Sequence, residues 1–122
     1  MTATTGSGDP STTIYHNPKC STSRKTLDLL RENGIEPTVV HYLKTPPTRA
    51  ELATMIADAG IEVRAAVRKR ESLYAEIGLA DASDDELLDA MAAHPILIER
   101  PFVTTSKGTR LARPIDAVRE IL

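Results

Sequence analysis

The spacing of apolar residues predicts a strand, a helix and a second strand in the first third of the chain. Residues 12–16 form a short β-prone run that ends at Asn17-Pro18, a pair typical of a tight loop. Apolar positions then recur every three or four residues over Ser21–Asn33, which predicts a helix that stops at Gly34. The β-branched and aromatic residues of Thr38–Leu43 predict the second strand.

Helix signals replace strand signals between Pro46-Pro47 and His94-Pro95. Two capping-box signatures predict a helix over about residues 49–59 and another that ends near His94. Residues 61–77 predict one or two short helices between them. The capping pairs are Thr48 with Glu51 and Ser83 with Glu86.

The end of the chain predicts a hairpin followed by a helix. Phe102–Thr105 and Thr109–Arg113 flank a Ser-Lys-Gly turn, and Pro114 suits the first turn of a closing helix. This element order is that of an α/β, thioredoxin-like (glutaredoxin-like) β-α-β-β-α core. We therefore expect a single domain over residues 12–122, with a core of 12–46 and 95–122 and a helical insertion over about 47–94. Residues 1–11 are almost all polar and are expected to form a flexible tail.

Composition narrows the class of protein. The 122 residues carry 15 Lys or Arg and 17 Asp or Glu, and this balance argues against binding to nucleic acid or anionic lipid by bulk charge. No apolar run approaches the ~20 residues needed to cross a bilayer. One cysteine excludes an internal disulfide and a cysteine-rich zinc site, and three scattered histidines suggest no metal. We expect a cytoplasmic monomer.

Cys20 stands where the first strand gives way to the first helix. Unpaired backbone N–H groups at a helix start favour an anion, whether a thiolate or a bound oxyanion. The hydroxyls of Ser21, Thr22 and Ser23 favour the same anions, as does the positive charge of Lys19 and Arg24. The sequence therefore predicts a reactive, thiolate-prone cysteine beside an oxyanion pocket, rather than a small buried hydrophobe.

The spacing around Cys20 excludes two related chemistries. Phosphatase-type cysteine enzymes place an arginine after five intervening residues, whereas Arg24 follows after three. Dithiol oxidoreductases use two cysteines separated by two residues, and Ser23 occupies the second position here. A sulfur intermediate on Cys20 must therefore be released by a thiol from another molecule.

The sequence resembles the glutaredoxin-coupled arsenate reductases, known as the ArsC family, from about residue 12 to the end. The motifs that carry the resemblance are Tyr15–Arg24, His41–Leu43, Pro46–Arg49, Gly60–Arg64, His94–Ile98, Arg100-Pro101 and Gly108–Pro114. The resemblance implies a thioredoxin-like fold with an inserted helical subdomain. Ser21, where glycine is common in the family, a shorter loop near residues 82–84 and the tail depart from the family pattern.

The resemblance assigns three arginines, Arg68, Arg100 and Arg113, to the arsenic oxyanion. Guanidinium groups suit this role because they stay charged and offer paired donors to an anion. Ser21 and Thr22 are expected to add donors from the cysteine loop. The remaining basic residues near these positions are interpreted as solvated surface residues; they are Arg64, Lys69, Arg70 and Arg110.

Two further expectations concern residues near Cys20. A charged His16 imidazole would lower the thiol pKa, and the resemblance implies this role or an orienting one; a structural histidine bonded to backbone fits the sequence equally well. Pro101 matches the cis-proline that precedes the third strand of thioredoxin-like folds, so we expect a cis Arg100–Pro101 bond. His41 and His94 are assigned to structure.

The function implied by the resemblance is reduction of arsenate to arsenite. Cys20 would form a thioarsenate, glutathione would attack this adduct, and glutaredoxin would collect the glutathione, with no bound cofactor. Two alternatives remain. Spx-type proteins share the fold and bind RNA polymerase, and some similar proteins bind glutathione without reducing arsenate.

Overall fold

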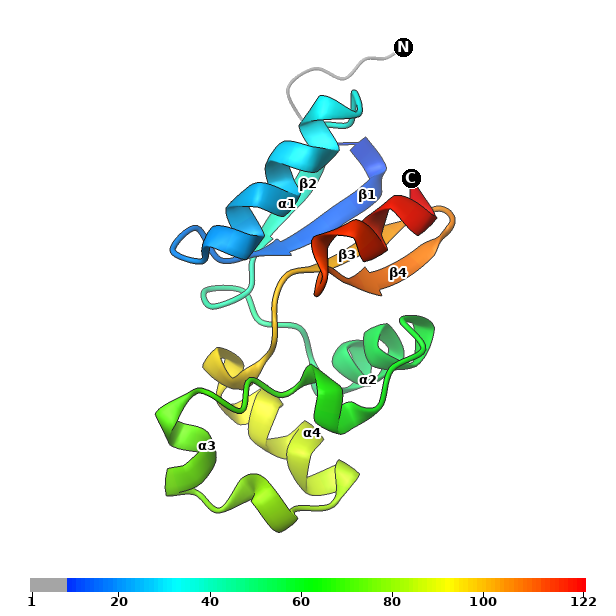
Figure 1. Cartoon of the computed structure of the whole chain (residues 1–122). Coiled ribbons are helices and arrows are strands. Elements are labelled where there is room, and N and C mark those ends of the chain that lie inside the picture. Colours follow the sequence, from blue (N-terminus) through cyan, green and yellow to red (C-terminus); the bar gives the residue numbers. More distant parts are fainter. Residues whose placement is uncertain (1–8) are drawn as a thin grey trace. The chain divides into compact units, whose positions relative to one another are not determined.

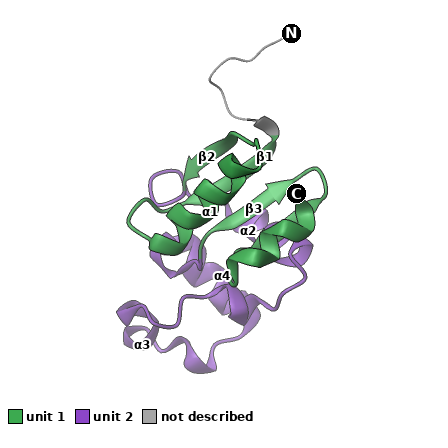
Figure 2. Cartoon of the chain, turned by 45° about the horizontal axis from the view of Figure 1, so that its top comes forward, with its two compact units in different colours: residues 1–41, 100–122 green, residues 42–99 purple. Residues whose placement is uncertain are grey.

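The chain divides into two compact units, coloured separately in Figure 2. The structure is a computed structural model that describes residues 9–122, so most of the tail expected at residues 1–11 lies outside the described residues. Unit 1 is built from residues up to His41 and from Arg100–Leu122. Unit 2 is Tyr42–Glu99, which extends the helical insertion expected over residues 47–94 at both ends.

Unit 1 contains a mixed four-stranded sheet in the order β2-β1-β3-β4. The strands are β1 (Asp9–His16), β2 (Pro37–His41), β3 (Phe102–Thr105) and β4 (Gly108–Leu111). β1 runs parallel to β2 and antiparallel to β3, and β3 pairs with β4 in the predicted hairpin. A parallel pair needs a crossover, and the helix between β1 and β2 provides it. This arrangement is the predicted thioredoxin-like core.

Two helices lie on the same face of this sheet (Figure 1). They are α1 (Ser21–Glu32) and the closing 3₁₀ helix η4 (Ile115–Ile121). Their apolar sides bury the core of the unit against β1, β3 and the residue after β4. The buried members are Ile14, Leu29, Leu30, Val103, Ala112, Val118 and Ile121. The core is aliphatic and anchors the second half of α1, through Leu29 and Leu30, together with the hairpin.

Unit 2 contains no strand of the sheet, as expected for a helical insertion. Its elements are α2 (Arg49–Asp58), η1 (Val63–Ala66), α3 (Ser72–Glu76), η2 (Leu79–Asp81), α4 (Asp84–Ala93) and η3 (Pro95–Leu97). Both predicted capping boxes are present, with Thr48 and Glu51 starting α2 and Ser83 and Glu86 starting α4. A short antiparallel bridge joins Val67 to Ile98.

The strand boundaries correct three sequence predictions. β1 begins at Asp9, where Asp9 pairs with Pro37 of β2. The prediction of a flexible tail is therefore wrong for residues 9–11. β2 ends at His41 and not at Leu43, because its last partner is His16, after which β1 turns away at Asn17. In the same way β4 begins one residue early, at Gly108, and ends at Leu111 instead of Arg113, since β3 offers no partner before Phe102.

Candidate active site

The Cys20 loop is held by hydrogen bonds at both of its ends. The backbone N–H of Cys20 donates to the Asn17 carbonyl at 3.0 Å, and the Asn17 side chain accepts from Lys19 N–H at 3.0 Å. Beyond the loop, Arg24 N–H donates to the Cys20 carbonyl at 3.0 Å and opens α1. The Arg24 guanidinium donates back to the Pro18 carbonyl at 2.8 Å. Cys20 is therefore the residue that caps the start of α1, as the sequence predicts.

The environment of Cys20 favours the thiolate. The residue is 8 % exposed, and this burial by itself would raise the pKa of the thiol. A hydrogen bond from the Ser23 backbone N–H stabilises the thiolate and so opposes the effect of burial on the pKa. The Arg100 guanidinium and the Thr22 backbone N–H lower the pKa further. Together these groups lower the Cys20 pKa from its ordinary value. Such a thiol is a better nucleophile at neutral pH.

Two of the predicted arginines lie in unit 1 with Cys20. Arg100 is buried, 6 % exposed, and its side chain hydrogen-bonds the Cys20 sulfur. Arg113 Nη2 lies 3.8 Å from Cys20 Sγ, while its Nε donates to the Arg100 carbonyl at 2.9 Å. The Arg113 guanidinium thus contacts both the Cys20 sulfur and the backbone of Arg100. A pair of arginines at one thiolate can hold an oxyanion during nucleophilic attack.

The hairpin positions both arginines. Arg100 precedes β3 and Arg113 follows β4, and Ala112 N–H donates to the Pro101 carbonyl at 2.9 Å where the hairpin opens. The Arg100–Pro101 bond is cis, which confirms the sequence prediction. The Arg113–Pro114 bond is also cis, and the sequence did not indicate this. Both arginines therefore adjoin a cis bond.

His16 contacts the cysteine loop through Ser23. His16 Nδ1 and Ser23 Oγ share a hydrogen bond of 2.6 Å, and Ser23 Oγ also accepts from Asn17 N–H at 3.0 Å. Burial lowers the pKa of His16, and the charges of His41, Arg31 and Arg24 lower it further. These effects favour a neutral imidazole, whose Nδ1 can accept a hydrogen bond from the Ser23 hydroxyl. The lowered pKa argues against a charged His16, and the contact with Ser23 is compatible with an orienting role or a structural one, so the role of His16 stays a prediction.

Ser21 and Thr22 occupy the first turn of α1. Ser21 is exposed and Thr22 half-buried, and the Thr22 carbonyl accepts from the buried Thr26 hydroxyl at 2.8 Å. The backbone N–H of Thr22, and not its hydroxyl, is hydrogen-bonded to Cys20 and helps to lower the Cys20 pKa. Their roles as donors to an oxyanion stay predictions.

Arg68, the third predicted arginine, belongs to unit 2. It follows η1, and its guanidinium Nη1 lies 2.9 Å from Glu71 Oε2. Arg64, four residues earlier, donates to the Tyr74 hydroxyl at 3.1 Å and to the carbonyls of Leu79 and Ala82. These contacts correct the interpretation of Arg64 as a solvated surface residue, because the residue is half-buried and its guanidinium is bonded inside unit 2.

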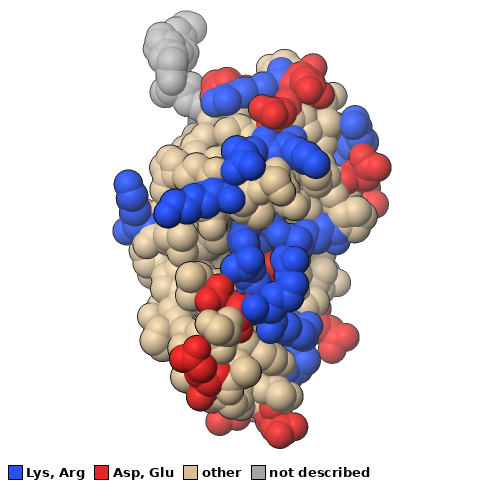
Figure 3. Space-filling model, turned by 60° about the vertical axis from the view of Figure 1, so that its left-hand side comes forward, with Lys and Arg blue, Asp and Glu red and all other residues tan. Residues whose placement is uncertain are grey.

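The distribution of charge on one face agrees with anion chemistry. Basic side chains predominate on the face drawn in Figure 3, although the chain as a whole is formally −2. Over residues 9–122 there is no group of three or more His, Cys, Asp or Glu residues that could hold a metal. Within the same range no helix is long and apolar enough to cross a bilayer.

Ser23 is the residue whose importance the sequence understated. Its side chain is fully buried and joins the end of β1 to the first turn of α1, yet a serine in a polar loop is indistinguishable from its neighbours by sequence. Ser23→Ala keeps the backbone N–H that lowers the Cys20 pKa but removes the hydroxyl bonds to His16 and Asn17 that hold the first turn of α1 in place. We therefore expect the Cys20 pKa to rise towards the free value of ~8.5 as this N–H is displaced. The substitution should also destabilise the fold by about 1–3 kcal/mol, because two buried polar groups lose their partner.

The measurement is the rate of Cys20 alkylation as a function of pH, together with thermal unfolding. Only the thiolate reacts, so a raised pKa moves the half-maximal rate to higher pH. The exposed Ser72, at the start of α3, gives the control variant Ser72→Ala, for which neither quantity should change. An unchanged midpoint in Ser23→Ala would separate Ser23 from the activation of Cys20.

The fold and this site define a class: a thioredoxin-like protein with one activated cysteine beside paired arginines. The family model described as the ArsC family matches residues 15–121. Because the match covers nearly the whole chain, the protein belongs to the ArsC family.

Named relatives agree with this assignment. The chain is 62 % identical over 112 residues to a protein of Rhizobium meliloti (strain 1021) named arsenate reductase, covering 90 % of this chain and 80 % of that protein. It is 59 % identical over 112 residues to the arsenate reductase of Escherichia coli (strain K12), covering 90 % and 79 %. A solved structure described as arsenate reductase from Vibrio cholerae superposes with a TM-score of 0.87 at 51 % identity, covering 91 % of this chain and 97 % of that one.

Proposed function

We propose that this protein reduces arsenate to arsenite by thiol chemistry at Cys20. The observation that carries the proposal is the Cys20 thiol, with its lowered pKa and with Arg100 and Arg113 at its sulfur. Two relatives named arsenate reductase, which are 62 % and 59 % identical to this chain, support the same substrate. A thiolate attacking an arsenate dianion meets like charge, and two guanidinium groups offset this repulsion.

The proposed reaction begins with attack of the Cys20 thiolate on arsenic. An As–S bond forms, an As–O bond breaks, and the departing oxygen leaves as water after protonation, which gives a thioarsenate on Cys20. Arsenic is still pentavalent at this stage. The arginines hold the remaining oxygens, whose charge is retained in the adduct.

Reduction requires two electrons from thiols outside the chain. Cys20 is the sole cysteine among the 122 residues, so no second thiol of this chain can form an internal disulfide. We propose that glutathione supplies the first external thiol and that glutaredoxin removes it, so that arsenate and two thiols give arsenite, one disulfide and water. We propose that Arg68 contributes to holding the same oxyanion. We also propose that the protein is a monomer. We propose a cytoplasmic location, since a reducing compartment keeps Cys20 as a thiol.

The test is formation of arsenite by the purified protein with glutathione and glutaredoxin added singly and together. We expect arsenite only when arsenate and both thiol components are present. Phosphate is the matched control, because it has the shape and charge of arsenate but cannot be reduced by thiols. Binding of glutathione without arsenite formation would contradict the proposal and favour the glutathione-binding alternative.

A further inference from the structure

Within unit 2, Arg68 and Glu71 form an ion pair that is less exposed than a second pair of the same spacing in unit 1. Their nitrogen and oxygen are 2.9 Å apart, and the two side chains are only 26 % and 18 % exposed. The Arg119–Asp116 pair in unit 1 has the same three-residue spacing and a separation of 3.0 Å, but its side chains are 58 % and 81 % exposed. An exposed pair is free to rearrange, whereas a shielded one fixes its geometry.

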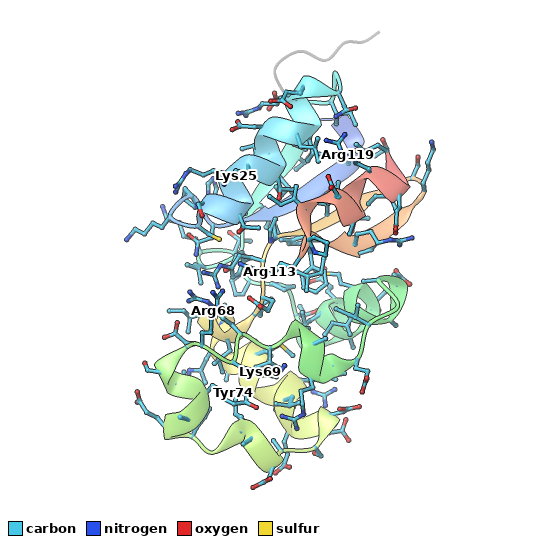
Figure 4. The ribbon with its side chains drawn as sticks, in the orientation of Figure 1. Lys25, Arg68, Lys69, Tyr74, Arg113 and Arg119 are labelled. Carbon is cyan, nitrogen blue, oxygen red and sulfur yellow. The ribbon has the colours of Figure 1, made fainter. Side chains whose placement is uncertain are left out.

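The backbone around Arg68 is also fixed. Arg68 N–H donates to the Leu97 carbonyl at 2.7 Å, next to the bridge between Val67 and Ile98. Glu71 N–H donates to the Arg68 carbonyl at 3.1 Å, which closes a turn and brings the two side chains together. The pair is therefore built into the segment between η1 and α3. Arg68 is labelled in Figure 4.

Glu71 engages only one nitrogen of the Arg68 guanidinium. Its carboxylate takes Nη1, while Nε is buried and has no hydrogen-bond partner among the described residues. A buried donor without a protein partner is a group that a bound anion can satisfy. The Nε–Nη2 edge carries two parallel N–H groups, which match two oxygens of an oxyanion.

We propose that Glu71 is a positioning residue that holds Arg68 with its Nε–Nη2 edge presented to the substrate oxyanion. This inference rests on the proposed function, because it takes arsenate as the anion. Arginine has many rotamers, and a side chain that is already held loses less freedom when the anion binds. Glu71 thus strengthens oxyanion binding, although its own charge repels the anion.

Two variants of nearly equal size separate positioning from charge. In Glu71→Gln the side-chain carbonyl still accepts from Arg68 but the negative charge is gone. In Glu71→Met the length and packing are kept but no strong acceptor remains. If Glu71 positions Arg68, Glu71→Met should weaken arsenate binding about threefold to tenfold, and Glu71→Gln should stay within about twofold of the parent.

The experiment measures arsenate binding by calorimetry in a Cys20→Ser background, where no adduct forms, and arsenate KM and kcat in the parent background. The matched control is Asp116→Ala, which breaks the exposed pair of the same spacing and should leave both readouts unchanged. Thermal unfolding is recorded for each variant. A merely structural role would lower the unfolding temperature of Glu71→Met without changing the affinity of the folded protein for arsenate.

The outcomes are distinct. Weaker binding in Glu71→Met with near-parent binding in Glu71→Gln supports the inference. Tighter binding in both variants would mean that Glu71 competes with the anion, and unchanged binding in Glu71→Met would mean that it does not position Arg68; either overturns the inference. If the parent protein binds arsenate but forms no arsenite, the proposed function fails while the Glu71 comparison still stands on binding.

Discussion

Cys20→Ser is expected to abolish arsenate reduction, with a loss on the order of 10³-fold or more. A serine hydroxyl stays protonated at pH 7 and is a far weaker nucleophile than a thiolate whose pKa is lowered by its surroundings. The measurement is arsenite formation with glutathione and glutaredoxin in excess. Because Cys20 is the sole cysteine of the chain, no neighbouring thiol can substitute for it.

The same variant should remain folded, and this makes the result interpretable. Cys20 is the N-cap residue of α1, a position at which serine is among the preferred residues. We therefore expect an unfolding temperature equal to or slightly above that of the parent. Residual activity within tenfold of the parent, in a folded Cys20→Ser protein, would remove Cys20 from the mechanism.

Arg113→Ala is expected to lower kcat/KM by about 30-fold to 1000-fold, which corresponds to about 2–4 kcal/mol of lost transition-state stabilisation. Arg113 makes two contacts at once, to Cys20 Sγ through Nη2 and to the Arg100 carbonyl through Nε. Arg113→Lys should recover only part of the loss, because one ammonium group cannot occupy both positions. The measurement is steady-state kinetics with arsenate as the varied substrate.

The matched control for Arg113 is Arg110→Ala. Arg110 lies three residues earlier, in β4, where its guanidinium pairs with Glu120. Its removal should leave kcat/KM within about twofold of the parent, since exposed ion pairs contribute little. Equal losses in the two variants would show that general positive charge, and not the contact with Cys20, governs activity.

The sequence predicted those features of the fold that depend on local signals. Both capping boxes, the hairpin turn and the Gly34 stop after α1 are encoded within a few residues, and each lies where it was expected. Strand ends depend on a partner from elsewhere in the chain. The pairing of Asp9 with Pro37 therefore could not be inferred from a polar N-terminal segment.

The candidate site also has features that local sequence predicts and features that depend on contacts formed on folding. The position of Cys20 at a helix start and the cis bond before Pro101 follow from local sequence and from family resemblance. The contact between His16 and Ser23 joins residues seven apart on different elements, and burial then favours the neutral imidazole. No pattern in the sequence distinguishes a charged His16 from a neutral one, because both depend on surroundings that form only on folding.

The hairpin determines which length changes the protein can accommodate. Arg100 and Arg113 meet at the open end of the hairpin, where the Arg100 carbonyl accepts from Arg113 and the Pro101 carbonyl accepts from Ala112. The turn at residues 106–107 lies at the opposite end of β3 and β4. Lengthening the turn leaves the spacing of the arginines intact, whereas a single-residue insertion between Leu111 and Arg113 shifts one arginine against the other. Peptide tags or reporter insertions therefore belong in the turn, and natural length variation is expected there.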